Sequence, residues 1–460
     1  MSINRTRKHP HLMIHTSVFS TKHIILWVLL LAAPPVFGAD IYGRVTLGGF
    51  AAKETYSDTD GGSDRNDYMT ASGRIFLRAS ALGESRNWEF VSDIRDQNDF
   101  FDKLNRERLQ LEPVNTFQVR QLKVRYETSN RVALGEVGRF PVIEAGNVHC
   151  DGMLAGLKIT PGLRWAAFGG LNPKRNDQTY VRYNDDSFVS GTYFKYQSQD
   201  IGWEKNLFSS IAFVSQAVGH DIDRQYIFNN SVYQWSANSR LLYFVYLDFV
   251  PHTYVQMGYL SWMQDLGWRL TSEVNGLAVD VIEYTRRQGL RERLSASAYK
   301  EGSFKLRNDL APSFNLSTTF AYGQREADQL IKREYIFGVG MPRLLSSRVD
   351  VSLKLGYRDN FTSQDSFARF GTGYFSSEWE LTLDVEGGQE IYSTGETLHP
   401  LTAEASLGAI FSKPFFIAVS VERAQDERVS VWAGFFKLTY RFGSTEAPPV
   451  RDGAAPRGRL

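Results

Sequence analysis

The chain of 460 residues could hold two or three ordinary domains, or one large single sheet such as a barrel. Its 42% apolar content and negative mean hydropathy exclude a membrane protein built from many helices, while its 38 glycines, 22 tyrosines and 31 phenylalanines are typical of an all-β chain. The formal net charge of +1 gives no sign of nucleic-acid binding.

The first 39 residues have the composition of a cleaved signal peptide. Four cationic side chains lie in this segment: Arg5, Arg7, Lys8 and Lys22. The apolar run 24–33 is too short to span a bilayer, and the small residues Gly38 and Ala39 offer a cleavage position. A retained anchor helix is the alternative. Export of a chain whose single cysteine is Cys150 leaves the protein without an internal disulfide.

One pattern repeats from Ile41 onward, in which apolar and polar residues alternate through short segments separated by polar breaks. In one such segment Val351, Leu353 and Leu355 share a face, and Lys354 lies on the other. The expected strands are 41–50, 69–81, 87–95, 117–127, 131–139, 154–160, 163–170, 191–198, 208–216, 225–235, 240–249, 254–264, 268–283, 291–299, 303–322, 334–341, 347–358, 367–375, 378–387, 400–411, 414–423 and 429–442.

These strands favour a single closed sheet. A soluble all-β chain of this length would divide into several domains, and no linker interrupts the pattern. A sheet that is apolar outside and charged inside must close where water cannot reach the backbone. The sequence therefore predicts an all-β fold: one large transmembrane antiparallel β-barrel over 40–442, with about 22 strands (range 16–22). The first strand begins close to the cleavage position, so no N-terminal plug domain is expected.

The strand number depends on one proline. Pro312 falls inside the expected strand 303–322, where its missing amide donor is costly in a ladder without edges. If Pro312-Ser313 forms a hairpin instead, neighbouring short segments have to merge to keep the number even. The breaks between strands alternate mostly long and short, which predicts that both chain ends lie on the periplasmic side.

The last expected strand, GFFKLTYRF, carries an apolar row that ends on an aromatic residue. This row resembles the terminal-strand signal of Gram-negative outer-membrane proteins: Phe436, Leu438, Tyr440 and Phe442. The resemblance implies a bacterial outer-membrane location and recognition by the barrel assembly machinery. Unlike that family, the chain continues beyond the aromatic residue, and 443–460 is expected to be a disordered periplasmic tail.

Charged residues on the expected inner face are the best candidates for function. Early strands supply a basic set: Arg44, Arg74, Arg78, Lys123, Arg125 and Arg139. Late strands supply a largely acidic set, interspersed with three cations: Glu380, Asp384, Glu386, Glu404 and Glu422, with Arg348, Lys354 and Arg358. Opposed charges of this kind resemble the constrictions of porins, which select small polar solutes. The alternative is that these ions pair with one another and select nothing.

The segment GRFPVIEAGNVHCDG, 138–152, is more apolar than an exposed loop would be. It could fold into the lumen, as the constriction loop of porins does, or form an irregular external loop. Its Gly138-Arg139 and Asp151-Gly152 pairs bear a weak likeness to alginate-export-type barrels. Adjacent His149 and Cys150 are poor evidence for a metal site, and none is predicted.

The sequence therefore predicts a porin-like channel for passive diffusion of small polar or ionic solutes. The alternative is a structural or docking barrel that houses a partner in an export or electron-conduit assembly. No enzyme is expected, because the four histidines after 1–39 lie in no catalytic motif: His149, His220, His252 and His399. No cofactor or nucleic acid is expected. The expected partners are outer-membrane lipid, the assembly machinery, small polar solutes and either a second copy or a periplasmic protein.

Overall fold

The computed structural model describes residues 39–57, 63–99, 115–173, 183–198, 206–250, 252–280, 298–344, 348–412 and 414–443. The expected signal peptide, 1–39, lies outside the described residues apart from Ala39, and so does the expected tail, 443–460, apart from Gly443. No helix in the described ranges is long and apolar enough to cross a membrane.

Strands make up almost all of the described chain. In order, they are β1 (Asp40–Ser57), β2 (Ser63–Leu82), β3 (Trp88–Asp99), β4 (Asn115–Glu127), β5 (Ala133–Val142), β6 (Val148–Lys158), β7 (Leu163–Pro173), β8 (Tyr183–Gln197), β9 (Asn206–Val218), β10 (Asp221–Ser236), β11 (Ser239–Val250) and β12 (Tyr254–Gly267). They continue with β13 (Leu270–Val279), β14 (Tyr299–Ala311), β15 (Phe314–Arg325), β16 (Ile331–Leu344), β17 (Val349–Asn360), β18 (Ser363–Phe375), β19 (Trp379–Tyr392), β20 (Thr397–Leu398), β21 (Leu401–Ser412), β22 (Phe415–Gln425) and β23 (Val429–Gly443). A 3-10 turn, η1 (Ile143–Ala145), separates β5 from β6.

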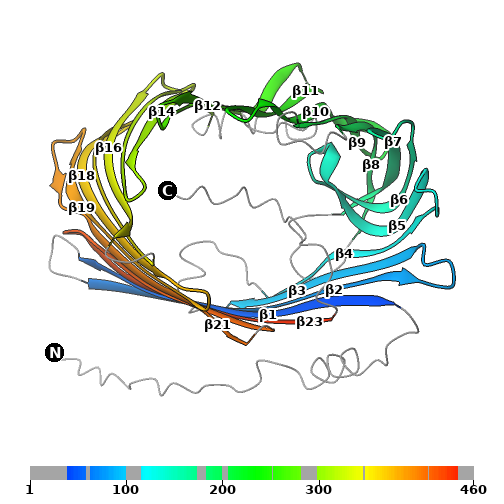
Figure 1. Ribbon diagram of the computed structural model, residues 1–460, viewed down its shortest axis with the longest axis horizontal. Coiled ribbons are helices and arrows are strands. Elements are labelled where there is room, and N and C mark those ends of the chain that lie inside the picture. The colour runs from blue at the N-terminus through cyan, green and yellow to red at the C-terminus, as the bar shows by residue number, and fades with distance from the viewer. Residues whose placement is uncertain are drawn as a thin grey trace, which may run out of the picture.

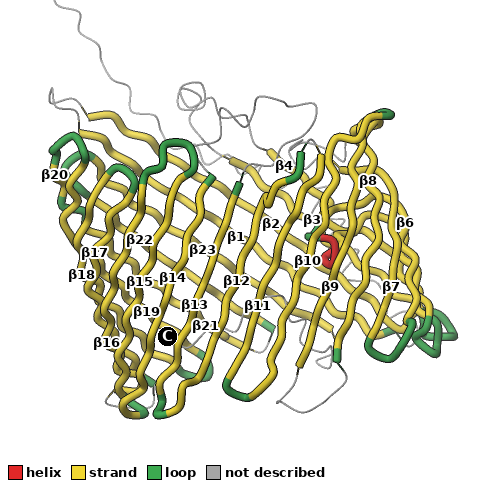
Figure 2. The backbone as a smooth tube through the Cα atoms, turned by 90° about the horizontal axis from the view of Figure 1, so that it is seen from above, coloured by secondary structure: helices red, strands yellow, loops and turns green. Residues whose placement is uncertain are grey.

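The strands form a closed antiparallel barrel. Each strand of the wall pairs with the next along the chain, and β1 pairs with β23 to close the ring (Figure 1). The two-residue β20 pairs only with β19, so 22 of the described strands build the wall. The strands cross the wall at a tilt (Figure 2). The predicted all-β barrel of about 22 strands is confirmed.

Two details of the expected strand list differ from the structure. Pro312 and Ser313 form the turn between β14 and β15, with Ala311 opposite Phe314, so the expected single strand 303–322 is wrong. The physical reason is that proline has no amide hydrogen for the ladder. The other expected strand, 291–299, lies outside the described residues except at its end, where Tyr299 begins β14. The split of 303–322 adds one strand to the expected number, and 291–299 adds none within the described residues, so the number of wall strands stays at 22.

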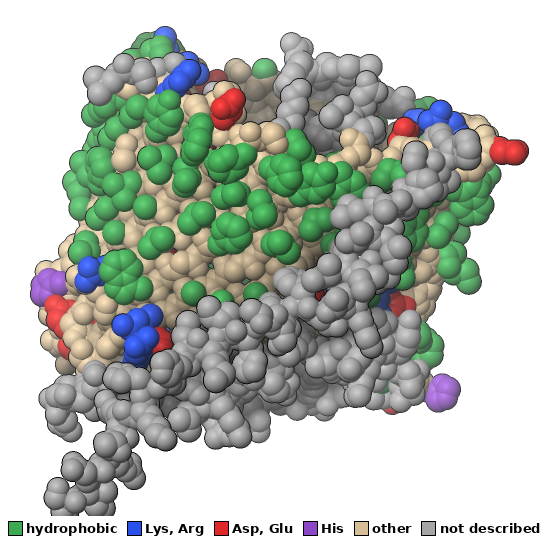
Figure 3. Space-filling view, turned by 90° about the horizontal axis from the view of Figure 1, so that it is seen from below, with side chains coloured by type: hydrophobic (Ala, Val, Ile, Leu, Met, Phe, Trp, Pro, Cys, Tyr) green, Lys and Arg blue, Asp and Glu red, His purple; other side chains and the backbone are tan. Residues whose placement is uncertain are grey.

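The outer face of the wall is apolar. The rows predicted from alternation are exposed, with Leu355 51% and Leu381 52% accessible, and hydrophobic side chains cover the wall while charged ones gather toward its rims (Figure 3). Soluble monomers rarely expose a contiguous apolar surface of this kind. The two ends of the sheet lie at one rim, where Tyr42 of β1 is opposite Gly443 of β23. The rows that alternate with these apolar rows along each strand face the lumen.

Candidate functional site: a charged lumen with an infolded hairpin

The tip of the β5–β6 hairpin leaves the wall. β5 pairs with β4 only as far as Arg139, and β6 pairs with β7 only from Asp151 onward. The intervening strand residues of the hairpin, 140–142 and 148–150, pair only with each other. Figure 1 shows this hairpin curling into the ring, and Figure 2 places its short helical turn beside β9. Of the two alternatives for 138–152, the structure shows the infolded one.

Glycines permit the bend at the base of the hairpin. Gly138 has φ +120°, and a Cβ atom there would lie 2.2 Å from the carbonyl oxygen of Leu122. Gly152 lies directly opposite Gly138, and its Cβ would lie 2.1 Å from the carbonyl oxygen of Gly169. No other residue type fits either position without backbone movement. The Gly-Arg and Asp-Gly pairs singled out in the sequence are therefore the hinge of the infolded segment.

An apolar core inside the barrel holds the hairpin against the wall. Phe140, Ala145 and Cys150 are fully buried. Removing their apolar surface from water stabilises the hairpin in this position. They belong to one cluster with inward-facing residues of the wall: Phe168, Val189, Tyr193, Val214, Tyr226 and Phe228. The inner face of the wall is thus apolar on this side, whereas the sequence pattern predicted a charged interior.

Polar contacts fix the end of the hairpin. The Tyr226 hydroxyl donates to the carbonyl of Ala145 at 3.1 Å, and the Tyr246 hydroxyl donates to the carbonyl of Gly146 at 3.0 Å. The Lys195 ammonium lies 2.9 Å from a carboxylate oxygen of Glu144. These three contacts come from β8, β10 and β11, so the tip is attached to several strands of the wall.

Most of the predicted pore-lining residues share the inward rows. The strand register places on them Arg44, Arg74, Arg78, Lys123, Arg125, Lys354, Arg358, Glu380, Asp384, Glu386, Glu404 and Glu422. On β2, the Arg74 guanidinium makes a two-pronged ion pair with Asp93 at 2.7 and 2.8 Å, and Arg78 lies 2.7 Å from Glu89. The first cations of the basic set are therefore paired with carboxylates of β3.

The next cations of the basic set form a small network. Lys123 lies 2.8 Å from Glu136, and Arg125 contacts both Glu127 at 2.9 Å and Glu136 at 3.8 Å. Arg164 of β7 reaches Glu127 at 3.2 Å. Sequence reasoning missed Glu136, although the same period-two counting along β5 places it on the inward row.

Two predicted residues lie elsewhere. Arg139 is opposite Leu122 in the register, on the other face from Lys123, and pairs with Asp151 at the hairpin base. Its prediction as an inward-row residue is wrong, because Glu136 marks the inward row of β5 and a residue three positions further along the strand lies on the other face. Arg348 precedes β17 and donates to the Tyr374 hydroxyl at 3.2 Å, so it lies at the rim and outside the strand rows.

Arg358 is the centre of a mixed cluster on the late strands. Its guanidinium lies 3.4 Å from Glu386, 3.4 Å from Asp365 and 3.6 Å from Glu334, and it stacks 3.8 Å above the ring of Phe367. Three carboxylates from three neighbouring strands thus share one cation.

An acidic row continues from this cluster toward the seam. Asp384, Glu404 and Glu422 are directly opposite one another on β19, β21 and β22. Arg369 approaches Asp384 at 3.1 Å, and Lys354 is opposite Arg369 in the register. The late strands therefore carry both signs, and the predicted segregation into a basic and an acidic arc is partial.

The terminal strand forms the seam of the barrel. Its outward row contains the predicted assembly residues Phe436, Leu438, Tyr440 and Phe442. The Phe442 ring occupies the space beside Gly43 of β1, where a Cβ atom would lie 2.1 Å from the ring. On the inward face, Arg44 is opposite Arg441. The ring of the last aromatic residue thus packs against the first strand where β1 and β23 close the barrel.

Comparison with known proteins finds similarity at the level of structure. No model of a protein family matches the sequence, and no curated protein matches it. The chain is similar to OpdO of Pseudomonas aeruginosa, with 10% identity and a TM-score of 0.41 over 88% of this chain and 97% of the other. It is similar to OccAB4 of Acinetobacter baumannii, with 10% identity and a TM-score of 0.38 over 89% and 100%. The translocation pore of the P pilus usher PapC gives 8% identity and a TM-score of 0.38 over 87% and 99%.

Proposed function

We propose that the protein is a channel in the bacterial outer membrane through which small polar or ionic solutes diffuse passively. The observation that carries the proposal is the closed 22-strand ring, whose outer rows are apolar and exposed while charged side chains occupy the inward rows. In such a wall every backbone N–H and C=O group can pair within the sheet. The apolar outer rows suit the hydrocarbon of the bilayer, and the charged inner rows suit water.

The hairpin divides the lumen into a filled side and an open side. It covers the inner faces of β8–β10, so the solute path runs along the remaining wall, which carries the ion pairs of β2–β5 and β16–β19. Paired charges keep water in the bore and order passing solutes, but they largely cancel one another. We therefore expect a bore that favours small polar solutes and discriminates only moderately between ions.

Conductance of the purified barrel in a planar lipid bilayer tests the channel. Stable single-channel steps are the expected result, since the inward rows on one side are hydrophilic. Electrically silent insertion would contradict the proposal and support the docking barrel, in which a partner fills the bore.

Ion preference tests the basic residues of the early strands. We expect the triple replacement of Arg74, Arg78 and Arg125 by serine to shift the preference toward cations, because Asp93 and Glu89 then lose their counter-ions. The matched control replaces the same three residues by lysine, which keeps the charge. A reversal potential in a salt gradient that is the same for both variants would show that these cations do not influence permeation.

A further inference from the structure

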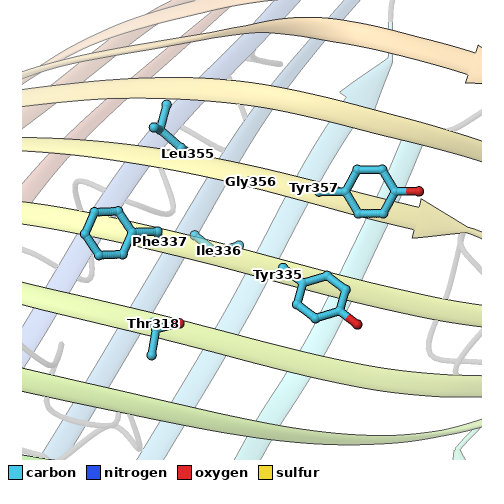
Figure 4. A pocket seen from close by; sticks show the side chains of 7 residues that line it. All are labelled: Thr318, Tyr335, Ile336, Phe337, Leu355, Gly356 and Tyr357. Carbon is cyan, nitrogen blue, oxygen red and sulfur yellow. The ribbon is translucent and has the colours of Figure 1, made fainter.

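The outer wall is hollowed over β15, β16 and β17. A depression of about 300 Å³ lies here, at the lower end of the size of ligand clefts. Its sides are the side chains of Tyr335, Phe337, Leu355 and Tyr357, with Thr318 at the β15 edge (Figure 4). The floor is the backbone at Ile336 and Gly356, because the strand alternation turns these two residues toward the lumen.

The depression is apolar at one end and carries hydroxyl groups at the other. Tyr335 is opposite Tyr357, with ring centroids 6.5 Å apart, and Phe337 is opposite Leu355. Figure 4 shows both tyrosine hydroxyls turned away from Phe337 and Leu355. Tyrosine rings favour the boundary between hydrocarbon and water, so the hydroxyl end marks the headgroup level.

A cation follows the hydroxyl end on the same face. Arg333 lies two residues before Tyr335 in the chain, about 7 Å from it along β16 on the side away from Phe337, and its side chain is exposed. Asp359 lies directly opposite Arg333, but no ion pair joins Arg333 to a carboxylate within the described part of the chain. A guanidinium has five N–H donors, so Arg333 has donors for a bound phosphate.

We propose that this depression binds an anionic phospholipid, with an acyl chain along the facing side chains of Phe337 and Leu355 and the phosphate on Arg333. The inference rests on the proposed membrane location, because it requires the outer rows to face hydrocarbon. The order of groups from Phe337 through Tyr335 to Arg333 matches the order of chain, ester and phosphate in such a lipid. A second copy of the barrel would present a convex wall, which does not fill a depression of this size.

Native mass spectrometry of the full chain in detergent, titrated with phosphatidylglycerol, tests the site. We expect one phosphatidylglycerol adduct that withstands activation better than an adduct of diacylglycerol, which has the chains without the phosphate. R333Q should weaken the adduct about tenfold, because a charge-assisted hydrogen bond is lost. T318F should weaken it by filling the depression. R423Q is the matched control, since Arg423 is also exposed on the outer wall but stacks on Trp432.

Two outcomes would overturn the inference. Equal retention of phosphatidylglycerol by R333Q and R423Q would show that Arg333 does not hold the phosphate, and equal binding of diacylglycerol would show that the phosphate is not recognised. Either result obtained with a conducting barrel refutes the lipid site alone. A chain that neither inserts into bilayers nor conducts refutes both the site and the proposed function.

Discussion

Replacing Phe140 by alanine tests whether the infolded hairpin limits the bore. Phe140 is fully buried in the apolar core between the hairpin and the inner wall, beyond the last β5 residue that pairs with β4. The substitution therefore removes packing that holds the hairpin in place and leaves the ladder between wall strands intact. We expect the hairpin to spend more time away from the wall, and the channel to become noisier.

The size of the effect follows from the contacts. Truncating a buried phenylalanine to alanine costs about 3–5 kcal/mol of stability. The hydroxyl contacts of Tyr226 and Tyr246 contribute about 1 kcal/mol each, and the partly exposed Lys195–Glu144 pair contributes about 1 kcal/mol or less. Phe140 is thus the largest of these attachments, and a loss of about 3 kcal/mol lowers the ratio of docked to undocked hairpin by roughly a hundredfold.

Single-channel recording at fixed salt and voltage measures this effect. F140A should show a larger mean conductance or frequent steps between two levels. The matched control is F370A, because Phe370 lies on the outer row of β18 and the same atoms are removed away from the lumen. If F140A unfolds more easily than the wild-type protein but conducts with the same level and noise, the hairpin does not limit the bore.

Three further outcomes are expected. G152A should destabilise the hairpin base, seen as a lower melting temperature, because its Cβ would lie 2.1 Å from a backbone oxygen; an unchanged temperature would contradict the close approach. Hydrogen bonds from the backbone and ring of His399 hold the pKa of Glu427 below its usual value. The stabilisation from this contact is therefore complete above the usual carboxyl pKa and is lost as the pH falls through the lowered pKa. NMR titration of Glu427 should show the lowered pKa, and H399A should bring the pKa back toward its usual value. F442A should slow insertion in cells by emptying the space over Gly43, and wild-type insertion would speak against the assembly role.

Alternation was sufficient to predict the wall. The rows containing Leu353 and Leu381 were assigned to the outer face from their period of two, and the structure exposes them. Pro312 was recognised as a conflict inside a strand, and the structure resolves it as a turn. These features depend on residues close together in the chain, which sequence patterns report well.

Pairing between strands was harder to predict. The partner of Arg74 is Asp93 on the next strand, and that contact depends on the register across a turn, which alternation within one strand does not fix. Arg139 was assigned to the lumen, whereas the register that puts Glu136 on the inward row puts Arg139, opposite Leu122, on the other face of β5. The apolar core inside the barrel likewise joins strands that are distant in sequence.

Lipid contact along β17 tests the central claim most directly. Single cysteines at successive positions 352–357, in a chain whose native Cys150 is replaced by serine, would carry a fluorophore in reconstituted vesicles. We predict that lipid-borne nitroxides quench the labels at Leu353, Leu355 and Tyr357, while a water-soluble quencher reaches Ser352 and Lys354. Quenching without this alternation, or by the water-soluble agent at every position, would contradict a barrel wall between hydrocarbon and an aqueous lumen.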